Sequence, residues 1–363
     1  MSARLRKTIN VDNNALKYNY QQIQNYVGKN VSVMPILKGN GYGLGLEKLS
    51  PALNELRPRF VGVTDAQEAL RIAHLCPETI PLVLYQPNID DIPCIINNRF
   101  HIAISEMEFL QKLNQKAHLV ETIIPIHLNL DIGYGAIGIQ PNQIQKFCEE
   151  ISKMKGISVK GVFSHFSSLS PEVHASQKEK FEMQAKTIEQ RIGKVEYKHI
   201  CSGSAMLSRK DTHYDIVRPG SLFYGYYEQE KFADMINVKP SFNVATNIIS
   251  IRDLSKGTPI GYDGEFVCER DSRIATLPIG YCDGLGSLMH RNGASFVIND
   301  QRAPIVSGMS MNLSTIDLTN VKGKVNLGDE VFIFDNKNVT FEEVVKSAEK
   351  SPEEFMINIC RNA

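Results

Sequence analysis

Short apolar runs alternate with longer amphipathic segments along roughly the first 230 residues of the chain. The runs are nearly continuously apolar, which is typical of strands that are buried on both faces of a parallel sheet. The segments between them carry apolar residues at helical spacing on otherwise polar faces, as in DAQEALRIAHL (65–75). The runs predict eight strands, at 31–37, 60–64, 80–85, 100–105, 123–131, 159–166, 197–203 and 216–225.

Eight strand–helix units fit an α/β fold of the (β/α)8 or TIM-barrel type. A doubly wound open sheet is the alternative, and the count of eight units favours the barrel. One of the predicted helices has clear start and stop signals, since Ser170 and Pro171 precede it and Gly193 follows it.

The pattern changes after residue 235, where strand-like runs follow one another with turn signals and little helix. This predicts two domains, a barrel at 10–235 and a mostly β C-terminal domain at 236–363. Residues 1–9 are a candidate addition to the second domain. A short amphipathic helix is predicted at 341–350, FEEVVKSAEK.

Composition excludes several classes of partner. Lys plus Arg and Asp plus Glu both total 40, so the net charge of zero provides no field for nucleic acid or an anionic membrane. The seven cysteines are scattered and never spaced as CxxC, which argues against a zinc site or a disulfide framework. No apolar run approaches the roughly 20 residues of a membrane span, and the N-terminus lacks the apolar core of a secretory signal. We therefore expect a cytoplasmic protein without a metal.

The stretch MPILKGNGYGLG (34–45) is the strongest chemical signal, because it puts Lys38 at the end of the first predicted strand. Barrel enzymes carry their chemistry at this end of the strands. The stretch is neither a P-loop nor a GxGxxG motif, since the lysine precedes the glycines and Leu44 stands three residues after Gly41. A lysine at such a position suits covalent binding of a carbonyl compound or of pyridoxal phosphate (PLP). The alternative is a solvated lysine in a mobile loop.

Six segments, in chain order, resemble motifs of the alanine racemase family, and the resemblance spans the whole chain. The first carries the lysine that binds PLP, the second a histidine, the third and fourth a phosphate-binding serine and an arginine, and the last two carry tyrosines. The segments are PILKGNGYGLG (35–45), GVFSHFSS (161–168), CSGSAM (201–206), RPGSLFYG (218–225), GTPIGYDGEF (257–266) and TLPIGYCDG (276–284).

This resemblance implies a PLP-dependent isomerase that racemises L- and D-alanine, a peptidoglycan precursor, with two bases on opposite faces of the reacting carbon. Lys38 would be the base on one face and Tyr262 the base on the other. His165, backed by Arg218, would prepare Tyr262 for proton transfer, and Arg218 would face the pyridine nitrogen.

The resemblance also assigns binding roles. Tyr42, Ser204 and the backbone around Gly220 and Ser221 would hold the phosphate of the cofactor. Tyr262, Tyr281 and Met311 would contact the substrate, an amino acid, from the other subunit, so that a homodimer is implied.

Three residues depart from the family pattern. Asn129 stands where a lysine is usual, Ala136 where an arginine contacts the cofactor and the substrate carboxylate, and Asn312 where an aspartate is usual. Asn129 and Asn312 resemble broad-spectrum amino-acid racemases. A racemase for serine, lysine or arginine therefore stays open, as does a PLP-binding protein with little catalysis. A decarboxylase of related fold would use a Cys–Asp pair, which Cys282 and Asp283 offer.

Overall fold

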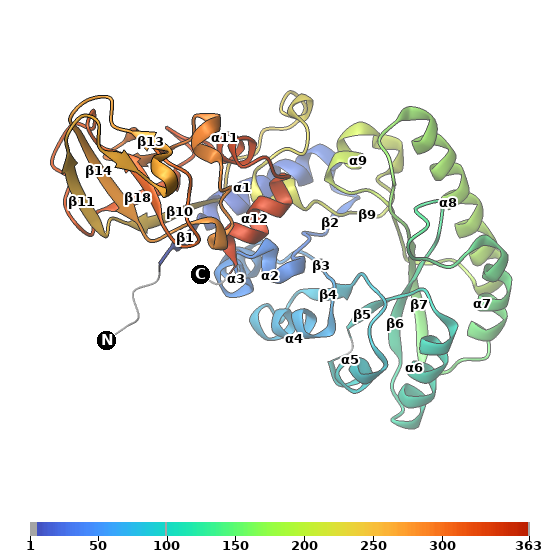
Figure 1. Cartoon of the computed structure of the whole chain (residues 1–363). Coiled ribbons are helices and arrows are strands. Elements are labelled where there is room, and N and C mark those ends of the chain that lie inside the picture. Colours follow the sequence, from blue (N-terminus) through green and yellow to red (C-terminus); the bar gives the residue numbers. More distant parts are fainter. Residues whose placement is uncertain (1–5, 99, 362–363) are drawn as a thin grey trace. The chain divides into compact units, whose positions relative to one another are not determined.

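The computed structural model describes residues 6–98 and 100–361. Packing divides the chain into two units, shown in Figure 1. The barrel unit contains residues 13–41 and 46–239, and the C-terminal unit contains residues 6–12, 42–45 and 240–361. The predicted domain limits at 10–235 and 236–363 stay a prediction.

Eight parallel strands close into a barrel. Six of them form one sheet in chain order, β3 to β8, and the other two, β2 and β9, pair with each other. Isolated bridges between Ile36 and Gly62 and between Ser202 and Arg218 join this pair to both edges of the larger sheet. The predicted (β/α)8 barrel is thus confirmed. The strands are β2 (Ser32–Val33), β3 (Phe60–Val63), β4 (Ile80–Val83), β5 (His101–Ile104), β6 (Ile124–Asn129), β7 (Ile157–Phe163), β8 (Tyr197–His199) and β9 (Ile216–Val217).

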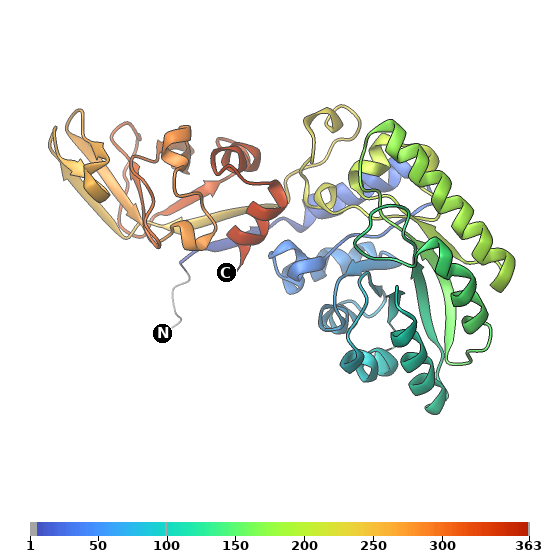
Figure 2. The same cartoon turned by 45° about the vertical axis from the view of Figure 1, so that its right-hand side comes forward.

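Helices surround the strands, as Figures 1 and 2 show most clearly for the green helices α6 to α8 outside β6 and β7. The predicted signals of α8 are confirmed, because the Ser170 hydroxyl accepts from the Val173 amide and Gly193 follows the last turn with φ of 90°. The helices of this unit are α1 (Asn13–Val27), α3 (Leu46–Leu56), α4 (Ala66–Leu75), α5 (Ile92–Asn98), α6 (Met107–Leu119), α7 (Ile144–Ile151), α8 (Pro171–Ile192), α9 (Gly203–Ser208) and α10 (Ser221–Tyr224).

The last predicted strand, 216–225, is wrong beyond residue 217. Pro219 has no amide hydrogen for a further strand bond, and the chain turns at Gly220 into the short helix α10. This early turn brings Ser221 to the end of the barrel strand β9, where barrel enzymes often bind phosphate.

The barrel interior contains polar side chains as well as apolar ones. His127 on β6 and His199 on β8 are fully buried, and Gly161 on β7 pairs in register with His127 on one side and Tyr197 on the other. A Cβ atom on Gly161 would lie 2.5 Å from Nδ1 of His127 and 2.8 Å from the backbone oxygen of Tyr197. The glycine therefore makes the room that the buried imidazole of His127 occupies.

The C-terminal unit is mostly β, as predicted. Its main sheet has the strand order β1-β10-β18-β15-β16, with β1 antiparallel to β10. Phe242, Phe334 and Phe341 pack edge to face beside it, with ring centres 5.4 to 5.5 Å apart. The predicted helix at 341–350 is α11, and a further helix, α12, follows it. The elements are β1 (Thr8–Val11), β10 (Phe242–Asn247), β11 (Ser250–Leu254), β12 (Pro259–Ile260), β13 (Phe266–Val267), β14 (Ser272–Leu277), β15 (Ser295–Ile298), β16 (Gln301–Pro304), β17 (Ser314–Asp317), β18 (Glu330–Phe334), α11 (Phe341–Ser347) and α12 (Pro352–Cys360).

In residues 6–98 and 100–361, no helix has the length and apolar character needed to cross a membrane. Those residues also contain no group of three or more His, Cys, Asp or Glu side chains that could hold a metal ion.

Candidate active site

Lys38 begins the turn that follows β2, two residues after the bridge between Ile36 and Gly62. The backbone amide of Ile36 donates to Pro219 and that of Leu37 donates to Gly62, so the chain just before the lysine is held on both sides. The turn α2 (Lys38–Tyr42) is left-handed at four successive residues, with φ of 66° at Gly39, 57° at Asn40, 66° at Gly41 and 55° at Tyr42. Gly39 and Gly41 therefore adopt a left-handed backbone conformation that most other residues avoid.

A buried carboxylate from α4 anchors this turn. Glu68, only 8% exposed, accepts from the backbone amide of Asn40 at 2.6 Å and from that of Thr64 at 3.2 Å. Charge-assisted bonds of this kind are stronger than neutral ones. Glu68 thus fixes the chain two residues after Lys38, a role that sequence reasoning missed. The signal for it was an acidic residue on the apolar face of DAQEALRIAHL.

Arg218 is the one arginine of the predicted site, and it is 5% exposed. Its guanidinium donates to the backbone oxygens of Ser164 at 2.7 Å and Ile200 at 3.1 Å. It also bonds Nδ1 of His199 at 2.9 Å and Nδ1 of His165 at 3.2 Å. These four acceptors are neutral. Burial lowers the pKa of Arg218 to about 10, so the guanidinium stays charged at neutral pH.

The arginine orders a chain of histidines that runs through the barrel. A guanidinium can only donate, so Nδ1 of His199 accepts and its proton sits on Nε2. That nitrogen is 3.0 Å from Nδ1 of His127, whose own Nε2 is 3.1 Å from Nδ1 of His101. Each ring in turn accepts at Nδ1 and donates at Nε2. Arg218 therefore imposes one direction on three successive hydrogen bonds.

The same histidines are held neutral. Burial and then Arg218 lower the pKa of His199, and burial and then His101 lower that of His127. Burial, followed by Lys160, lowers the pKa of His101 to about 4. The pKa of His165 is also lowered, by desolvation and then by the charges of Arg218 and Lys38, although one side of its ring is open to solvent. Sequence reasoning found no signal for His101, His127 and His199 as a group, because strand register alone brings them together.

Two serine hydroxyls form a cup for an anion at the starts of α9 and α10. Ser204 and Ser221 are 4% and 2% exposed. Both donate to the carboxylate of Glu228, Ser221 at 2.9 Å and Ser204 at short range. The carboxylate of Glu228, a residue that sequence reasoning missed, is thus the anion that the two hydroxyls bind in this structure. The donor set that bonds a carboxylate here suits a phosphate group equally well.

The end of β6 and the loop after it contain two of the departures from the family pattern. Asn129 is buried at the end of the strand, and Ala136 is exposed in the loop. Asp131 closes the loop by accepting from the amides of Gly133 and Gly135. Tyr134 places its ring edge-on to His165, with centroids 5.8 Å apart. The loop therefore offers a phenol beside His165 and no guanidinium.

The other predicted residues belong to the C-terminal unit. Tyr262, Tyr281 and Met311 are 77%, 45% and 56% exposed, whereas Tyr42 is 5% exposed. The backbone amides of Tyr281 and Cys282 donate to Ser310 and Met311, so the segments of Tyr281 and Met311 lie side by side.

The third departure, Asn312, lies in this same group. Its amide, with the oxygen turned toward Arg6, is 2.7 Å from the guanidinium, and Arg6 also pairs with Asp283 at 2.7 Å. The neutral amide of Asn312 thus accepts from Arg6, and the carboxylate of Asp283 balances the charge of that arginine.

Family models match almost the whole chain. The model described as alanine racemase, N-terminal domain, matches residues 11–228, and the model described as alanine racemase, C-terminal domain, matches residues 241–363. A relative from Caldanaerobacter subterraneus subsp. tengcongensis, named alanine racemase 2, is 30% identical over 363 residues, covering 98% of this chain and 92% of the relative.

Two solved structures show the same fold. The alanine racemase of Clostridium difficile 630 superimposes with a TM-score of 0.91 at 22% identity, covering 99% of this chain and 94% of that one. The alanine racemase of Bartonella henselae with covalently bound pyridoxal phosphate has a TM-score of 0.81 at 21% identity, with 97% of each chain covered.

The histidine chain predicts an acid-sensitive contribution to stability. The pKa of His101 is about 4 in the folded protein against 6.5 for an ordinary histidine, so only the unfolded chain takes up this proton between those values. His101→Asn keeps an acceptor for His127 and removes the titration. The free energy of unfolding, measured with urea from about pH 4 to 8, should therefore fall less steeply with acid in the variant, by up to about 1.4 kcal/mol per pH unit. Above about pH 7 the slopes of the two proteins should agree, because the His101 ring is then neutral in both the folded and the unfolded state. Equal slopes over the whole pH range would contradict the conclusion that His101 is held neutral.

Proposed function

The chain belongs to the alanine racemase family, and we propose that it interconverts L- and D-alanine with pyridoxal phosphate as its cofactor. The observation that carries the proposal is the set of groups gathered in the barrel unit. Lys38 begins the turn after β2, Arg218 is buried and charged, and Ser204 and Ser221 donate to the carboxylate of Glu228. An amine for covalent binding, a fixed donor that can face the ring nitrogen and hydroxyl donors for the phosphate together suit this cofactor.

Each of these groups has a place in holding the cofactor. Ser204 and Ser221 would bind the phosphate where the Glu228 carboxylate lies, together with the backbone around Gly220 and with Tyr42. Lys38 would hold the cofactor covalently through its amine, and Arg218 would face the ring nitrogen. When bound, the cofactor supplies an electron sink that makes the α-proton of the amino acid acidic.

Arg218 would keep that sink weak, because it holds its own proton. Its pKa of about 10 leaves it charged at neutral pH, and its bonds to Ser164, Ile200, His165 and His199 fix the guanidinium. A strong acid at the ring nitrogen would favour side reactions, whereas a fixed donor favours return of the proton to the same carbon. This supports racemisation over other chemistry of the cofactor.

Racemisation needs a base on each face of the α-carbon. We infer that Lys38 moves the proton on one face and the phenol oxygen of Tyr262 on the other. Tyr262 is 77% exposed within its own unit, as expected of a side chain that acts across an interface. The proposed active form is a homodimer in which Tyr262, Tyr281 and Met311 complete the site of the other subunit.

A wider substrate range is the second candidate, and the loop after β6 favours it. Ala136 carries no charge to hold a substrate carboxylate and leaves more room than an arginine would. Tyr134 belongs to the same loop as Ala136, and its ring lies beside His165. A racemase for serine, lysine or arginine would use the same two bases and differ only in the residues of this loop.

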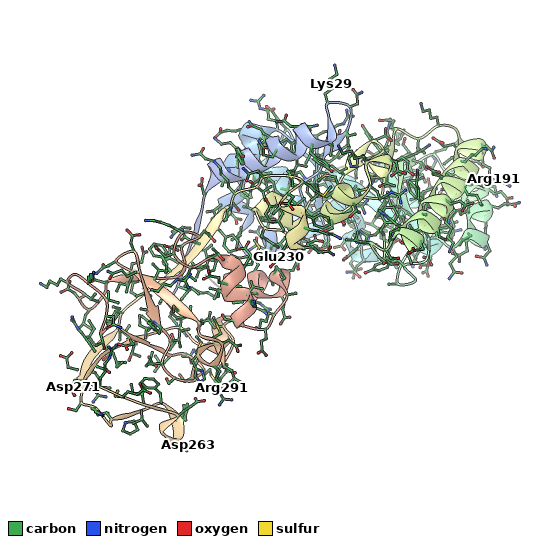
Figure 3. The ribbon with its side chains drawn as sticks, turned by 90° about the horizontal axis from the view of Figure 1, so that it is seen from above. Lys29, Arg191, Glu230, Asp263, Asp271 and Arg291 are labelled. Carbon is green, nitrogen blue, oxygen red and sulfur yellow. The ribbon has the colours of Figure 1, made fainter. Side chains whose placement is uncertain are left out.

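The lysine assignment is tested by Lys38→Ala. The variant should lose the visible absorption band of enzyme-bound PLP, because no amine remains at this position to bind the cofactor covalently. The control is Lys29→Ala, which removes an exposed lysine after α1, labelled in Figure 3, and should keep the band. A normal band in Lys38→Ala would contradict the assignment.

The two-base arrangement is tested by Tyr262→Phe in heavy water. Conversion must slow equally in both directions, because the equilibrium between enantiomers does not change. Deuterium uptake without inversion should nevertheless persist for the enantiomer whose proton Lys38 removes, and should fall by about a hundredfold or more for the other. Equal losses of uptake from L- and D-alanine would argue against two bases.

A further inference from the structure

Tyr262 lies at the tip of a small hairpin that has little support of its own. Strands β12 and β13 pair Pro259 with Val267 and Ile260 with Phe266, and backbone bonds of Cys268 with Gly257 and Thr258 continue the pairing away from the tip. An isolated hairpin of this size is marginally stable at best. Since the phenol is 77% exposed, packing in its own unit does not hold it. The position of the phenol therefore depends on the backbone of the tip.

That backbone is strained. Gly261, Asp263 and Gly264 have φ of 82°, 53° and 66°, and Asp263 is the only one of the three with a side chain. A residue other than glycine in this region persists only when surrounding contacts enforce it. Figure 3 shows Asp263 at the outer end of this loop.

Glu265, three residues after Tyr262, supplies such contacts. One carboxylate oxygen accepts from Arg291 at 2.7 Å and from Nε2 of His290 at 3.1 Å. The other accepts from the backbone amide of Gly308 at 3.1 Å. The three donors come from two separate segments of the unit, so one side chain ties the hairpin tip to both.

Gly308 has no side chain because the carboxylate occupies that space. A Cβ atom there would lie 2.5 Å from Oε2 of Glu265. The φ of Gly308 is outside the left-handed region, so its backbone does not require glycine. The neighbouring Ser307 also meets the tip, since a Cβ on Gly261 would lie 3.1 Å from that of Ser307.

The electrostatics favour an ionised carboxylate. The hydrogen bond from Arg291 is the main cause that lowers the pKa of Glu265 below its usual value, with His290 and the Gly308 amide acting in the same direction. His290 is 12% exposed, and its Nδ1 has no hydrogen-bond partner within the described residues. The ring is therefore oriented by its single bond to Glu265.

We propose that Glu265 is a positioning residue that fixes the Tyr262 phenol by anchoring the hairpin tip to His290, Arg291 and Gly308. It acts through the backbone and touches neither substrate nor cofactor. The proposal rests on the proposed role of Tyr262 as a base.

The first test does not depend on that role. Hydrogen–deuterium exchange is followed in the peptide that covers residues 259–267 of the full-length protein with PLP. Glu265→Gln and Gly308→Ala should each speed exchange of the tip amides by about tenfold, because each removes part of the anchor. Glu269→Gln, which changes an exposed carboxylate just beyond β13, should leave it unchanged. Unchanged exchange in the first two variants would overturn the proposal.

The second test connects the anchor to the chemistry. Both anchor variants should slow conversion of alanine by about tenfold. Deuterium uptake without inversion should be preserved for the enantiomer whose proton Lys38 removes and should fall for the other, as in Tyr262→Phe. Visible absorption and affinity for PLP should not change, which separates positioning from damage to the barrel. Symmetric loss of uptake from both enantiomers would refute positioning of Tyr262. If exchange at the tip is faster in the anchor variants but Tyr262→Phe is fully active, Glu265 anchors the hairpin tip and Tyr262 is not a base.

Discussion

The buried guanidinium of Arg218 is the constraint on which the barrel interior depends. Arginine has five donor hydrogens and no acceptor, so every group that faces it must accept. Two backbone oxygens and two imidazoles do so, and the imidazoles must then present their other nitrogen as a donor. The glycine at 161 makes room for the next ring along. One side chain thereby determines which ring nitrogen carries the proton in His199 and, through it, in His127.

A charge without a carboxylate partner is costly to bury, and here neutral dipoles compensate it. The consequence is chemical, because a carboxylate beside Arg218 would neutralise the field that the guanidinium exerts. In the proposed function the guanidinium would face the ring nitrogen of the cofactor. Because it keeps its own proton, it would leave that nitrogen unprotonated and the cofactor a weaker electron sink. Lys38 and the serine cup would hold the cofactor in place, while the arginine selects which reaction it supports.

Much of the barrel could be predicted from sequence, because strands buried on both faces leave an unmistakable apolar signature. Lys38, Ser204 and Arg218 were predicted from short motifs that resemble those of the family, and they lie in the segments that follow β2, β8 and β9. The histidine chain was not, since His101, His127 and His199 are separated by tens of residues and meet only through the register of β5, β6 and β8. Glu228 and Glu265 were missed for a similar reason: an acidic residue in a loop has no pattern until its partners are known.

Racemisation of alanine by this chain is tested directly with purified protein, PLP and L-alanine in heavy water. The products are separated on a chiral column and their deuterium content is measured by mass spectrometry. We expect D-alanine that carries deuterium at the α-carbon and approaches the amount of L-alanine, formed faster than the D-forms of serine, lysine or arginine from their L-forms. Bound PLP with neither inversion nor deuterium uptake from any of these amino acids would contradict it.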